Sequence, residues 1–446
     1  MRDLSMFNAE MEALSPADQD RVERERLPRQ LEHVFARSRM VRDKLSAAGL
    51  DPDPSRFGDP DRLAELPFIT KTDLRASQER EPPFGDFLAV SPEAVQRVHR
   101  TSGTTGRFVY TALTRNDLAV THDCGARAFW SAGLRPHHRV IHCLNYCLWM
   151  GGYTDHANLE NTGATVFPYG VGNSRQLVRV IREAGIDTIS STPSYPNVLE
   201  GVVREELDIE PRDLGLRLGL FGGEPGLDDP NVRQRIEATW GLTVRNANYG
   251  VSDLLCNFAA QCEENPDLHF LGQGALLARL IEPHEEGDVP VREGAVGEMV
   301  LTHLQKEAQP LVRYRTSDIL EITGTGPCRC GRTGFRFRVV GRSDDMLHVR
   351  GINVFPGGIA RVLEPLLPEV TGEFQIVVNH PSPYTQLDVA VEQGPAAAPE
   401  DAAALARRVE AGVKDALGIT VRVDLVPAGS IQRTDTGKVR RVLKTY

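Results

Sequence analysis

Short apolar segments alternate with helical stretches between residues 117 and 240, and this alternation is the strongest constraint on the fold. The apolar segments have the length and composition of strands. They cover residues 140–144, 165–167, 188–190 and 216–221, while helical spacing occupies residues 117–131, 176–184 and 231–240. Such alternation is typical of strand-helix-strand units, so it predicts an α/β fold with a largely parallel sheet.

The pattern changes on either side of this region. Helical spacing fills residues 9–48, and an extended stretch then leads into a helix capped at Thr70 or Thr72. Between residues 245 and 323 the strands shorten and the helices become sparse, which predicts a mixed sheet or barrel. The clearest strands of this part are residues 298–303 and 311–315.

The C-terminal part has the pattern of a compact α+β module that follows a turn at residues 341–345. Its predicted elements are helices at 358–366 and 399–416 and strands at 373–379, 386–392 and 420–425. The chain has 446 residues, and single hydrophobic cores stop growing at about 250–300 residues. We therefore predict a large N-terminal domain at residues 1–341 and a small C-terminal domain at residues 342–446.

The composition argues against several classes of function. A formal net charge of -10, without any block of Lys and Arg, argues against a nucleic-acid partner. No stretch reaches the roughly 18 apolar residues of a transmembrane helix, and the N-terminus lacks the apolar core of a secretory signal. Seven cysteines are too few for a disulfide framework in so long a chain. We expect a cytoplasmic protein without a membrane partner.

A run of small and hydroxylated residues lies between two strand-like segments, residues 95–99 and 108–113. The run consists of Thr101, Ser102, Gly103, Thr104, Thr105 and Gly106. Its glycines let the backbone approach a polyanion, and its hydroxyl groups can donate hydrogen bonds to phosphate. No Gly-Lys-Ser/Thr sequence follows, so the loop is not of the Walker type. It is predicted to hold phosphate, although plain turns have a similar composition.

Four residues in two segments carry the side chains that zinc prefers, and they are Cys262, His269, Cys328 and Cys330. Three thiolates and an imidazole suit a tetrahedral, structural zinc site. The Cys-x-Cys spacing is less diagnostic than Cys-x2-Cys, and buried free cysteines are common, so the residues alone leave both readings open. Cys256 is near enough to compete as a ligand. The other cysteines fit core or pocket positions, namely Cys124, Cys143 and Cys147.

Several motifs occur together over nearly the whole chain. They are the loop at 101–106, Leu66-Pro-Phe-Ile-Thr-Lys71, Gly222-Gly-Glu-Pro225, Tyr249-Gly-Val-Ser-Asp253, Lys306-Glu-Ala-Gln-Pro-Leu-Val-Arg-Tyr-Arg-Thr-Ser-Asp318, Gly341-Arg-Ser-Asp-Asp345, Arg350-Gly-Ile-Asn-Val-Phe-Pro356 and Thr436-Gly-Lys-Val-Arg-Arg441. In this order and spacing they resemble the phenylacetate-coenzyme A ligase family of the adenylate-forming superfamily. The resemblance implies that a carboxylate attacks the α-phosphate of ATP and expels pyrophosphate. A nucleophile then displaces AMP from the acyl-adenylate.

The resemblance also implies a nucleotide site. Asp318 matches the residue that binds both ribose hydroxyls in relatives, and Arg342 fits a ribose or phosphate contact. Tyr249 offers an aromatic face to adenine. The opposite wall and the rest of the motif would be formed by Gly223, Glu224, Pro225, Gly250 and Ser252.

Relatives hold Mg²⁺ on the phosphates with a loop threonine and a glutamate. The matching residues are Thr104 and Asp253, although Asp253 is one methylene shorter than the glutamate. Lys438 matches the adenylation lysine, whose charge would stabilise the transition state at the α-phosphate. In relatives the small domain is mobile and pivots at the position of Asp344, which withdraws the lysine and forms a thiol tunnel.

The family encloses its acid with the stretch that corresponds to residues 146–156. The candidate pocket residues are Tyr146, Trp149, Gly151, Gly152, Tyr153 and Asp155. Bulk or polarity replaces small or apolar residues at Cys147, Tyr153, Thr154, Asp155 and Asn158. Buried polar groups need partners, so this predicts an acid that is smaller or more hydrogen-bonding than phenylacetate, unless the changes affect packing alone.

Three functions therefore remain open. The first is ligation of a substituted, hydroxylated or aminated, aromatic acid to coenzyme A or a carrier-protein thiol. The second is an adenylating enzyme of specialised metabolism with a non-thiol acceptor, such as a diazotase that joins nitrite to an arylamine. The third is a non-catalytic nucleotide-binding protein, which the retention of Lys438 and Asp318 disfavours. Some relatives bind zinc at the four Cys and His positions, so we expect structural zinc. Relatives are commonly dimers, which leaves a homodimer open, because the sequence itself does not define the oligomeric state.

Overall fold

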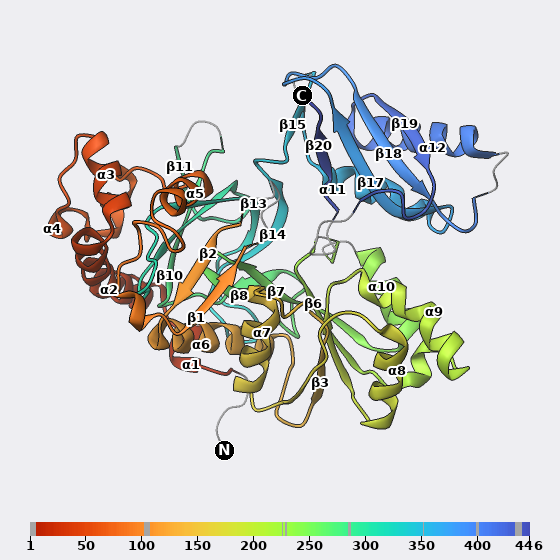
Figure 1. The fold of residues 1–446 in the computed structure, drawn as a ribbon, viewed down its shortest axis with the longest axis horizontal. Helices are drawn as coiled ribbons and strands as arrows, with labels where there is room; N and C mark the ends of the chain where they lie inside the picture. The colour runs from red at the N-terminus through yellow and green to blue at the C-terminus, as the bar shows by residue number, and fades with distance from the viewer. Residues whose placement is uncertain are drawn as a thin grey trace. The chain divides into compact units, whose positions relative to one another are not determined.

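The computed structural model describes residues 6–101, 108–224, 226–227, 230–283, 287–350, 352–397, 401–432 and 439–446. The chain divides into two compact units. The first unit comprises Met1–Thr316 and Leu320–Arg338, and the second comprises Ser317–Ile319 and Val339–Tyr446. Figure 1 shows the elements of both units as a ribbon coloured along the chain.

Helices fill the first part of the first unit. They are α1 (Ala9–Glu12), α2 (Pro16–Arg37), α3 (Arg39–Ala47), α4 (Pro54–Phe57), α5 (Lys71–Arg80) and the 3-10 helices η1 (Pro60–Glu65) and η2 (Pro92–Ala94). The first turn of a helix leaves backbone N–H groups without partners, and hydroxyl side chains accept from them here. Ser15 accepts from Asp18 N at α2, and Ser38 accepts from Val41 N at α3. The helical pattern predicted over residues 9–48 is confirmed.

The middle of the first unit contains the predicted parallel sheet, in which five strands pair in the order β4-β3-β5-β6-β7. The strands are β3 (Arg139–His142), β4 (Thr165–Pro168), β5 (Thr188–Ser191), β6 (Leu218–Gly222) and β7 (Thr243–Val251). The helices of this region are α6 (Arg115–Ser131), α7 (Met150–Asn161), α8 (Ser174–Glu183), α9 (Tyr195–Leu207), η3 (Pro211–Leu214) and α10 (Pro230–Trp240). Ile141, Ile189 and Phe221 belong to their shared core and are almost fully buried. The predicted α/β class is confirmed, and α7 and α9 are additional to the predicted helices.

The sheet continues beyond β7 with strands that are mostly antiparallel to their neighbours. They are β8 (Leu255–Gln261), β9 (Leu268–Phe270), β10 (Leu276–Ile281), β11 (Asp288–Val289), β12 (Val296–His303), β13 (Tyr314–Gly324) and β14 (Arg336–Arg342). The described residues form an open sheet of 12 strands in the order β11-β10-β12-β13-β14-β9-β8-β7-β6-β5-β3-β4. Of the two predicted alternatives, this part is therefore a mixed sheet and not a closed barrel.

Strand β13 begins at Tyr314, later than the strand predicted at residues 311–315. Arg313 has φ 48°, a left-handed value that interrupts an extended backbone. The N–H of Leu311 donates to His303 Nδ1, and the N–H of Arg313 donates to Thr302 Oγ1, each at 3.0 Å. The predicted start was wrong because the N–H groups of Leu311 and Arg313 bond to side chains of β12 in place of its backbone, and the left-handed Arg313 interrupts the extended conformation.

The predicted phosphate loop joins the two strands of a hairpin. Strand β1 (Arg97–Arg100) pairs antiparallel with β2 (Tyr110–Leu113), with Arg100 opposite Tyr110. Thr101 closes the hairpin, because its N–H donates to Val109 O at 2.9 Å and its Oγ1 accepts from Val109 N at 3.3 Å. Residues 102–107 lie outside the described residues.

The second unit has the predicted α+β composition. Its elements after β14 are β15 (Leu347–Val349), β16 (Ile352–Val354), α11 (Pro356–Leu363), η4 (Glu364–Leu366), β17 (Val370–Val378), β18 (Leu387–Gln393), α12 (Ala402–Leu417), β19 (Val421–Val426) and β20 (Val442–Lys444). Four of its strands form a sheet in the order β19-β18-β17-β20. Its core includes Ile359, Phe374 and Val409, which are fully buried. Strand β20 has three residues, too few for a pattern to predict.

Thr70→Ala should lower the free energy of unfolding by about 1 kcal/mol, because Thr70 caps α5. Thr70 Oγ1 accepts from Asp73 N at 3.4 Å, and Asp73 Oδ2 accepts from Thr70 N at 2.7 Å. Thr72→Ala is the matched control, since Thr72 is exposed in the first turn. Urea unfolding of both variants checks this, and equal losses would contradict the assignment of Thr70 as the cap.

Candidate active site

The turn between β7 and β8 presents a buried carboxylate, Asp253, whose two oxygens have different surroundings. Oδ2 accepts hydrogen bonds from Lys71 Nζ at 3.0 Å and from Tyr314 Oη at 2.9 Å. Oδ1 is buried and has no hydrogen-bond partner in the part of the chain that the structure describes. A buried anionic oxygen without a partner is energetically unfavourable, so Oδ1 is a candidate cation ligand.

Sequence reasoning missed Lys71 and Tyr314 as individual site residues. Lys71 is the first residue of α5, and Tyr314 is the first residue of β13, so three separate segments meet at one carboxylate oxygen. Both residues occur inside motifs that carry the family resemblance. Membership of those motifs was the available signal.

Tyr249 lies near the end of β7 and is partly exposed. Its ring makes edge contacts with Phe258, at 5.5 Å between ring centroids, and with Phe337, at 5.3 Å. The next residue, Gly250, cannot be replaced easily, because a Cβ there would lie 1.8 Å from Cys256 O. The ring is therefore held in one orientation while it keeps an accessible part, as an adenine platform requires.

The predicted residues after β6 lie close to this tyrosine. Gly222 of β6 pairs with Asn248 of β7, one residue before Tyr249. Gly223 follows with φ 79°, and Glu224 Oε2 accepts from Ser194 Oγ at 2.7 Å. These residues occupy the carboxyl ends of parallel strands, where open α/β sheets bind their ligands.

Ser252 connects this edge to the hairpin of the predicted phosphate loop. Thr111 Oγ1 of β2 donates to Ser252 O at 3.3 Å. Gln78 of α5 adds a second connection, because its side chain accepts from Tyr110 N at 2.9 Å and donates to Tyr110 O at 2.7 Å. The hairpin, α5 and the Asp253 turn are thus bound into one local structure.

In the second unit, Asp318, Arg342 and Asp344 form one chain of ion pairs. Arg342 Nη1 donates to Asp318 Oδ1 at 2.6 Å. Its Nε and Nη2 donate to the two oxygens of Asp344, each at 2.9 Å. The predicted ribose residue, the predicted phosphate contact and the predicted hinge residue therefore lie together.

The stretch predicted to enclose the acid consists of a loop followed by α7. The buried His142 is hydrogen-bonded to the first turn of α7. His142 Nε2 lies 3.1 Å from Gly151 O and 3.0 Å from Gly152 O, and Nδ1 lies 3.0 Å from Ser190 Oγ. Burial lowers the pKa of His142 to about 4, so the ring is neutral near pH 7 and Nε2–H donates to the two carbonyls. A Cβ at Gly152 would lie 2.1 Å from Asn145 O, so this position requires glycine.

The candidate pocket residues do not share one face of α7. Tyr153 is 49% exposed, its ring stacks on His156, and the Arg97 guanidinium lies 4.4 Å from its centroid. Tyr146 Oη bonds to His156 Nδ1 at 3.1 Å, whereas Asp155 is fully buried. Residues two apart on a helix point in nearly opposite directions, so the structure does not bring Tyr153 and Asp155 together.

Asp155 is surrounded by neutral hydrogen-bond donors from three elements. Asn248 Nδ2 of β7 donates to its Oδ2. Cys256 Sγ of β8 and Asn158 Nδ2 of α7 donate to its Oδ1, each at 3.2 Å. Burial raises the pKa of Asp155 to about 7, because these hydrogen bonds offset only part of the loss of solvation.

The four predicted zinc ligands lie together, with their ligand atoms all within 4.8 Å of one another. Cys262 Sγ lies 3.9 Å from Cys328 Sγ, and Cys330 Sγ lies 4.0 Å from His269 Nε2. Hydrogen bonds from Cys262 and then from His269 lower the pKa of Cys330, which favours its thiolate. Cys256 is not part of this group, because its thiol is engaged by the carboxylate described above.

A buried ion pair fixes the second of the two loops that carry these ligands. Arg332 Nε donates to Glu12 Oε2 at 2.6 Å, and both side chains are at most 2% exposed. The N–H of Thr333 donates to Glu12 O at 3.1 Å. The loop after Cys330 is therefore anchored to α1 by both side-chain and backbone bonds.

Part of the predicted set lies outside the described residues, namely Ser102, Gly103, Thr104, Thr105, Gly106, Pro225 and Lys438. Among the others are the four predicted zinc ligands described above and three further groups. The first unit holds the edge with Tyr249 and Asp253 and the cluster around Asp155. The second unit holds the ion-pair chain that begins at Asp318.

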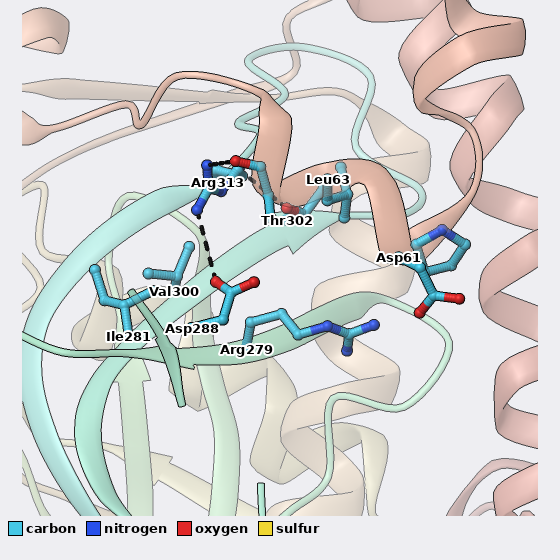
Figure 2. A pocket seen from close by; sticks show the side chains of 10 residues that line it. Asp61, Leu63, Arg279, Ile281, Asp288, Val300, Thr302 and Arg313 are labelled. Atoms are coloured by element: carbon cyan, nitrogen blue, oxygen red, sulfur yellow. Dashed lines mark hydrogen bonds and ion pairs between the residues drawn. The ribbon is translucent and has the colours of Figure 1, made fainter. Parts of the chain in front are cut away.

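A cavity of about 150 Å³ lies elsewhere in the first unit, and Figure 2 shows the side chains that line it. Arg313 Nη2 lies 3.9 Å from Asp288 Oδ1 at this cavity, and Arg313 Nη1 donates to Ala64 O at 2.7 Å. Asp61 and Arg279 complete a charged lining whose formal charges balance. None of the predicted site residues lines it, so this cavity is not the predicted active site.

The chain resembles known proteins over almost its full length. The model of the AMP-binding enzyme C-terminal domain matches residues 351–445. The phenylacetate-coenzyme A ligase of Thermus thermophilus is 34% identical, with 98% of this chain and 99% of that protein covered. The Escherichia coli phenylacetate-coenzyme A ligase is 33% identical, with 98% and 97% covered. The crystal structure of a 2-hydroxyisobutyryl-CoA ligase in the postadenylation state matches with a TM-score of 0.87 and 30% identity, and covers 99% of this chain and 93% of that chain.

The fold, the match to the AMP-binding enzyme C-terminal domain and the similarity to acid-coenzyme A ligases define an adenylate-forming enzyme. The chain belongs to the phenylacetate-coenzyme A ligase family. The predicted enzyme class, an AMP-forming acid ligase, is thereby confirmed. So is the predicted reaction at the level of the family, which is ATP-dependent adenylation of an acid followed by transfer to coenzyme A. Each helix among the described residues is too short or too polar to span a lipid bilayer.

Proposed function

We propose that this ligase activates a small carboxylic acid that carries a hydroxyl or amino group, such as a substituted aromatic acid, and transfers it to coenzyme A. The observation that supports this acid class is the buried Asp155, which lies in the stretch predicted to enclose the acid and is bonded to two amides and a thiol. Polar groups in a binding wall favour ligands that can pair with them. The name of one relative specifies a 2-hydroxy acid, which belongs to this class, whereas the name of another specifies phenylacetate, which carries no such group.

The adenylation roles follow the family resemblance. Lys438 would bring its charge to the α-phosphate and the attacking carboxylate as negative charge develops there. Asp318 would accept hydrogen bonds from the ribose hydroxyls, and Tyr249 would pack against adenine. Asp344 would be the hinge about which the small domain turns between the two reactions. Carboxylate attack on the α-phosphorus breaks the bond to the bridging oxygen, and pyrophosphate leaves with that electron pair.

Asp253 fits a divalent cation such as Mg²⁺. Lys71 and Tyr314 hold one carboxylate oxygen, so the group cannot turn away, and the other oxygen is available to a ligand. Mg²⁺ takes oxygen ligands and is usually held by one or two carboxylates together with substrate phosphates. Thr104 would be the second protein ligand. When bound, the ion would supply charge neutralisation on the phosphates.

Acid-dependent release of pyrophosphate from ATP should be fastest with a hydroxylated or aminated acid, because such an acid can pair with the polar wall. The panel contains phenylacetate, its hydroxylated and aminated derivatives, 2-hydroxyisobutyrate and nitrite. Each acid is assayed with and without coenzyme A and with and without an arylamine. A thioester should form when coenzyme A is present, and Lys438→Ala should lower pyrophosphate release by about 100-fold or more.

Three outcomes of this assay separate the alternatives. Fastest turnover with unsubstituted phenylacetate would contradict the proposed acid class. Turnover with nitrite and an arylamine, and with no carboxylic acid, would contradict the ligase proposal and favour the diazotase. Lys438→Ala that retains adenylation would remove this lysine from the mechanism. Four further expectations stay predictions, namely transfer to a carrier-protein thiol, a role in specialised metabolism, a homodimer and a cytoplasmic location.

Asp253→Asn should raise the Mg²⁺ concentration needed for half-maximal turnover by about tenfold or more, because an amide is a poorer ligand than a carboxylate of the same shape. Asp253→Glu should retain most of the response, since relatives have glutamate at this position. Tyr314→Phe is the structural control, because it removes a bond to Oδ2 and leaves Oδ1 in place. An unchanged Mg²⁺ dependence in Asp253→Asn would assign the ion to other ligands.

We further propose that Cys262, His269, Cys328 and Cys330 hold a structural zinc ion. Three thiols and one imidazole nitrogen converge within 4.8 Å, which fits a closed tetrahedral donor set. The buried pair of Arg332 and Glu12 anchors the adjacent loop. Zinc bound there would tie the end of β8, strand β9 and this loop together.

Metal analysis of purified protein should find about one zinc per chain. Cys328→Ser should lower the zinc content and the midpoint of thermal unfolding, because it removes one of the four donors. Cys256→Ser is the matched control and should keep the metal, since the Cys256 thiol bonds to Asp155. Absence of zinc in protein purified without chelators, or equal loss in both variants, would contradict the site.

A further inference from the structure

Asn248 lies between the two groups of predicted site residues in the first unit. On one side it pairs with Gly222, which directly precedes Gly223 and Glu224 of the predicted nucleotide site. On the other side its Nδ2 donates to Asp155, in the stretch predicted to enclose the acid. The acid carboxylate and the α-phosphate must meet during adenylation, so an acid bound for this reaction would lie near this junction.

In the side-chain amide of Asn248, the nitrogen is hydrogen-bonded within the protein, whereas the oxygen can accept a hydrogen bond from a ligand. Nδ2 donates to the buried Asp155 carboxyl, whereas no hydrogen bond to Oδ1 occurs among the described residues. Asn248 is partly exposed, so a ligand can reach it. Asn158 provides a contrast, because its Oδ1 also lacks a partner in the described structure but is fully buried.

Asp155 determines which amide atom is presented. An ionised carboxylate accepts hydrogen bonds and cannot donate them, so it selects the NH₂ end of Asn248 and directs the carbonyl end away. Reversal of the amide would replace a favourable contact by two acceptors facing each other. The presented atom is therefore a hydrogen-bond acceptor, which recognises a donor such as a hydroxyl or an amino group.

We propose that Asn248 Oδ1 selects acids that carry a hydroxyl or amino donor, and that Asp155 is the positioning residue that holds the amide in this orientation. This assignment rests on the proposed function, because it requires an acid to be adenylated at this edge. It adds a specific chemical requirement to that function: the substituent on the acid must donate a hydrogen bond. An ether at the same position, which can only accept, is disfavoured.

The ionisation of Asp155 gives the assignment a dependence on pH. Its described hydrogen-bond partners are Asn248 from β7, Cys256 from β8 and Asn158 from α7, and Cys256 alone among them can titrate. Burial raises the pKa of Cys256 well above its usual range, so this thiol stays neutral. Burial also raises the pKa of Asp155 to about 7. Below that pH a protonated Asp155 can either accept from Nδ2 or donate its O–H to Oδ1, so both amide orientations are satisfied and the preference for donor-bearing acids should weaken.

The test compares kcat/KM for hydroxyphenylacetates with kcat/KM for the matching methoxyphenylacetates, at each of the three ring positions, by pyrophosphate release. The pair 2-hydroxyisobutyrate and 2-methoxyisobutyrate extends it to aliphatic acids. Wild-type enzyme at pH 8 should prefer the hydroxyl form of at least one pair by about tenfold or more. Asn248→Ala and Asn248→Leu should bring this ratio near unity. Asp155→Asn should lower the ratio too, because an amide at position 155 accepts both orientations of Asn248.

Cys256→Ala is the matched control, because it removes a hydrogen bond to Asp155 Oδ1 and leaves the bond from Asn248 to Oδ2. This variant should keep the wild-type ratio. Asn248 variants that turn over phenylacetate and still keep the ratio would overturn the assignment. So would a wild-type ratio near unity for every pair, or a ratio that stays constant between pH 8 and pH 6. Failure of every acid to release pyrophosphate would instead contradict the proposed function itself.

Discussion

The edge of the sheet that carries the proposed nucleotide site depends on one buried carboxylate, because a buried carboxylate needs hydrogen-bond partners. Asp253 sits in the turn between β7 and β8, and its Oδ2 is bonded to Lys71 from α5 and to Tyr314 from β13. Loss of either donor would leave the buried carboxylate short of a hydrogen bond, at a cost of about 1–3 kcal/mol. The turn is therefore fixed to two other segments. Its second oxygen, for which the described chain offers no partner, is the position from which the proposed ion acts.

A second buried carboxylate, Asp117, fixes the start of the motif at residues 306–318 in the same way. Asp117 of α6 accepts from the N–H groups of Glu307 at 2.7 Å and Ala308 at 3.0 Å, and it forms a capping box with Thr114. The buried amine of Lys306 lies 3.7 Å from the same carboxylate. The start of this motif therefore secures the sheet to α6, whereas its last residue carries the proposed ribose contact. The first residues of this motif therefore stabilise the fold, and its last residue has the proposed role in binding the nucleotide.

The parallel half of the fold could be predicted because its strands are buried on both faces, so strands such as β5 and β6 are continuous apolar or small-residue runs. Helix α7 was not predicted, since Gly151, Gly152 and polar residues obscure its helical pattern and the bonds from His142 help to hold its start. The family motifs predicted individual site residues, such as Asp253. The motif that contains Tyr314 was a signal for that residue, but its bond to Asp253 and the bond from Asn248 to Asp155 were not predictable, because each joins segments far apart in the sequence.

In the proposed reaction this chain makes an acyl-adenylate before any thiol takes part. Exchange of labelled pyrophosphate into ATP measures the reversal of that step alone. With an accepted acid and Mg²⁺, and with coenzyme A left out, we expect rapid exchange that depends on the acid. Exchange that requires coenzyme A would contradict an independent adenylation step at this site. So would the absence of exchange under conditions in which the thioester still forms.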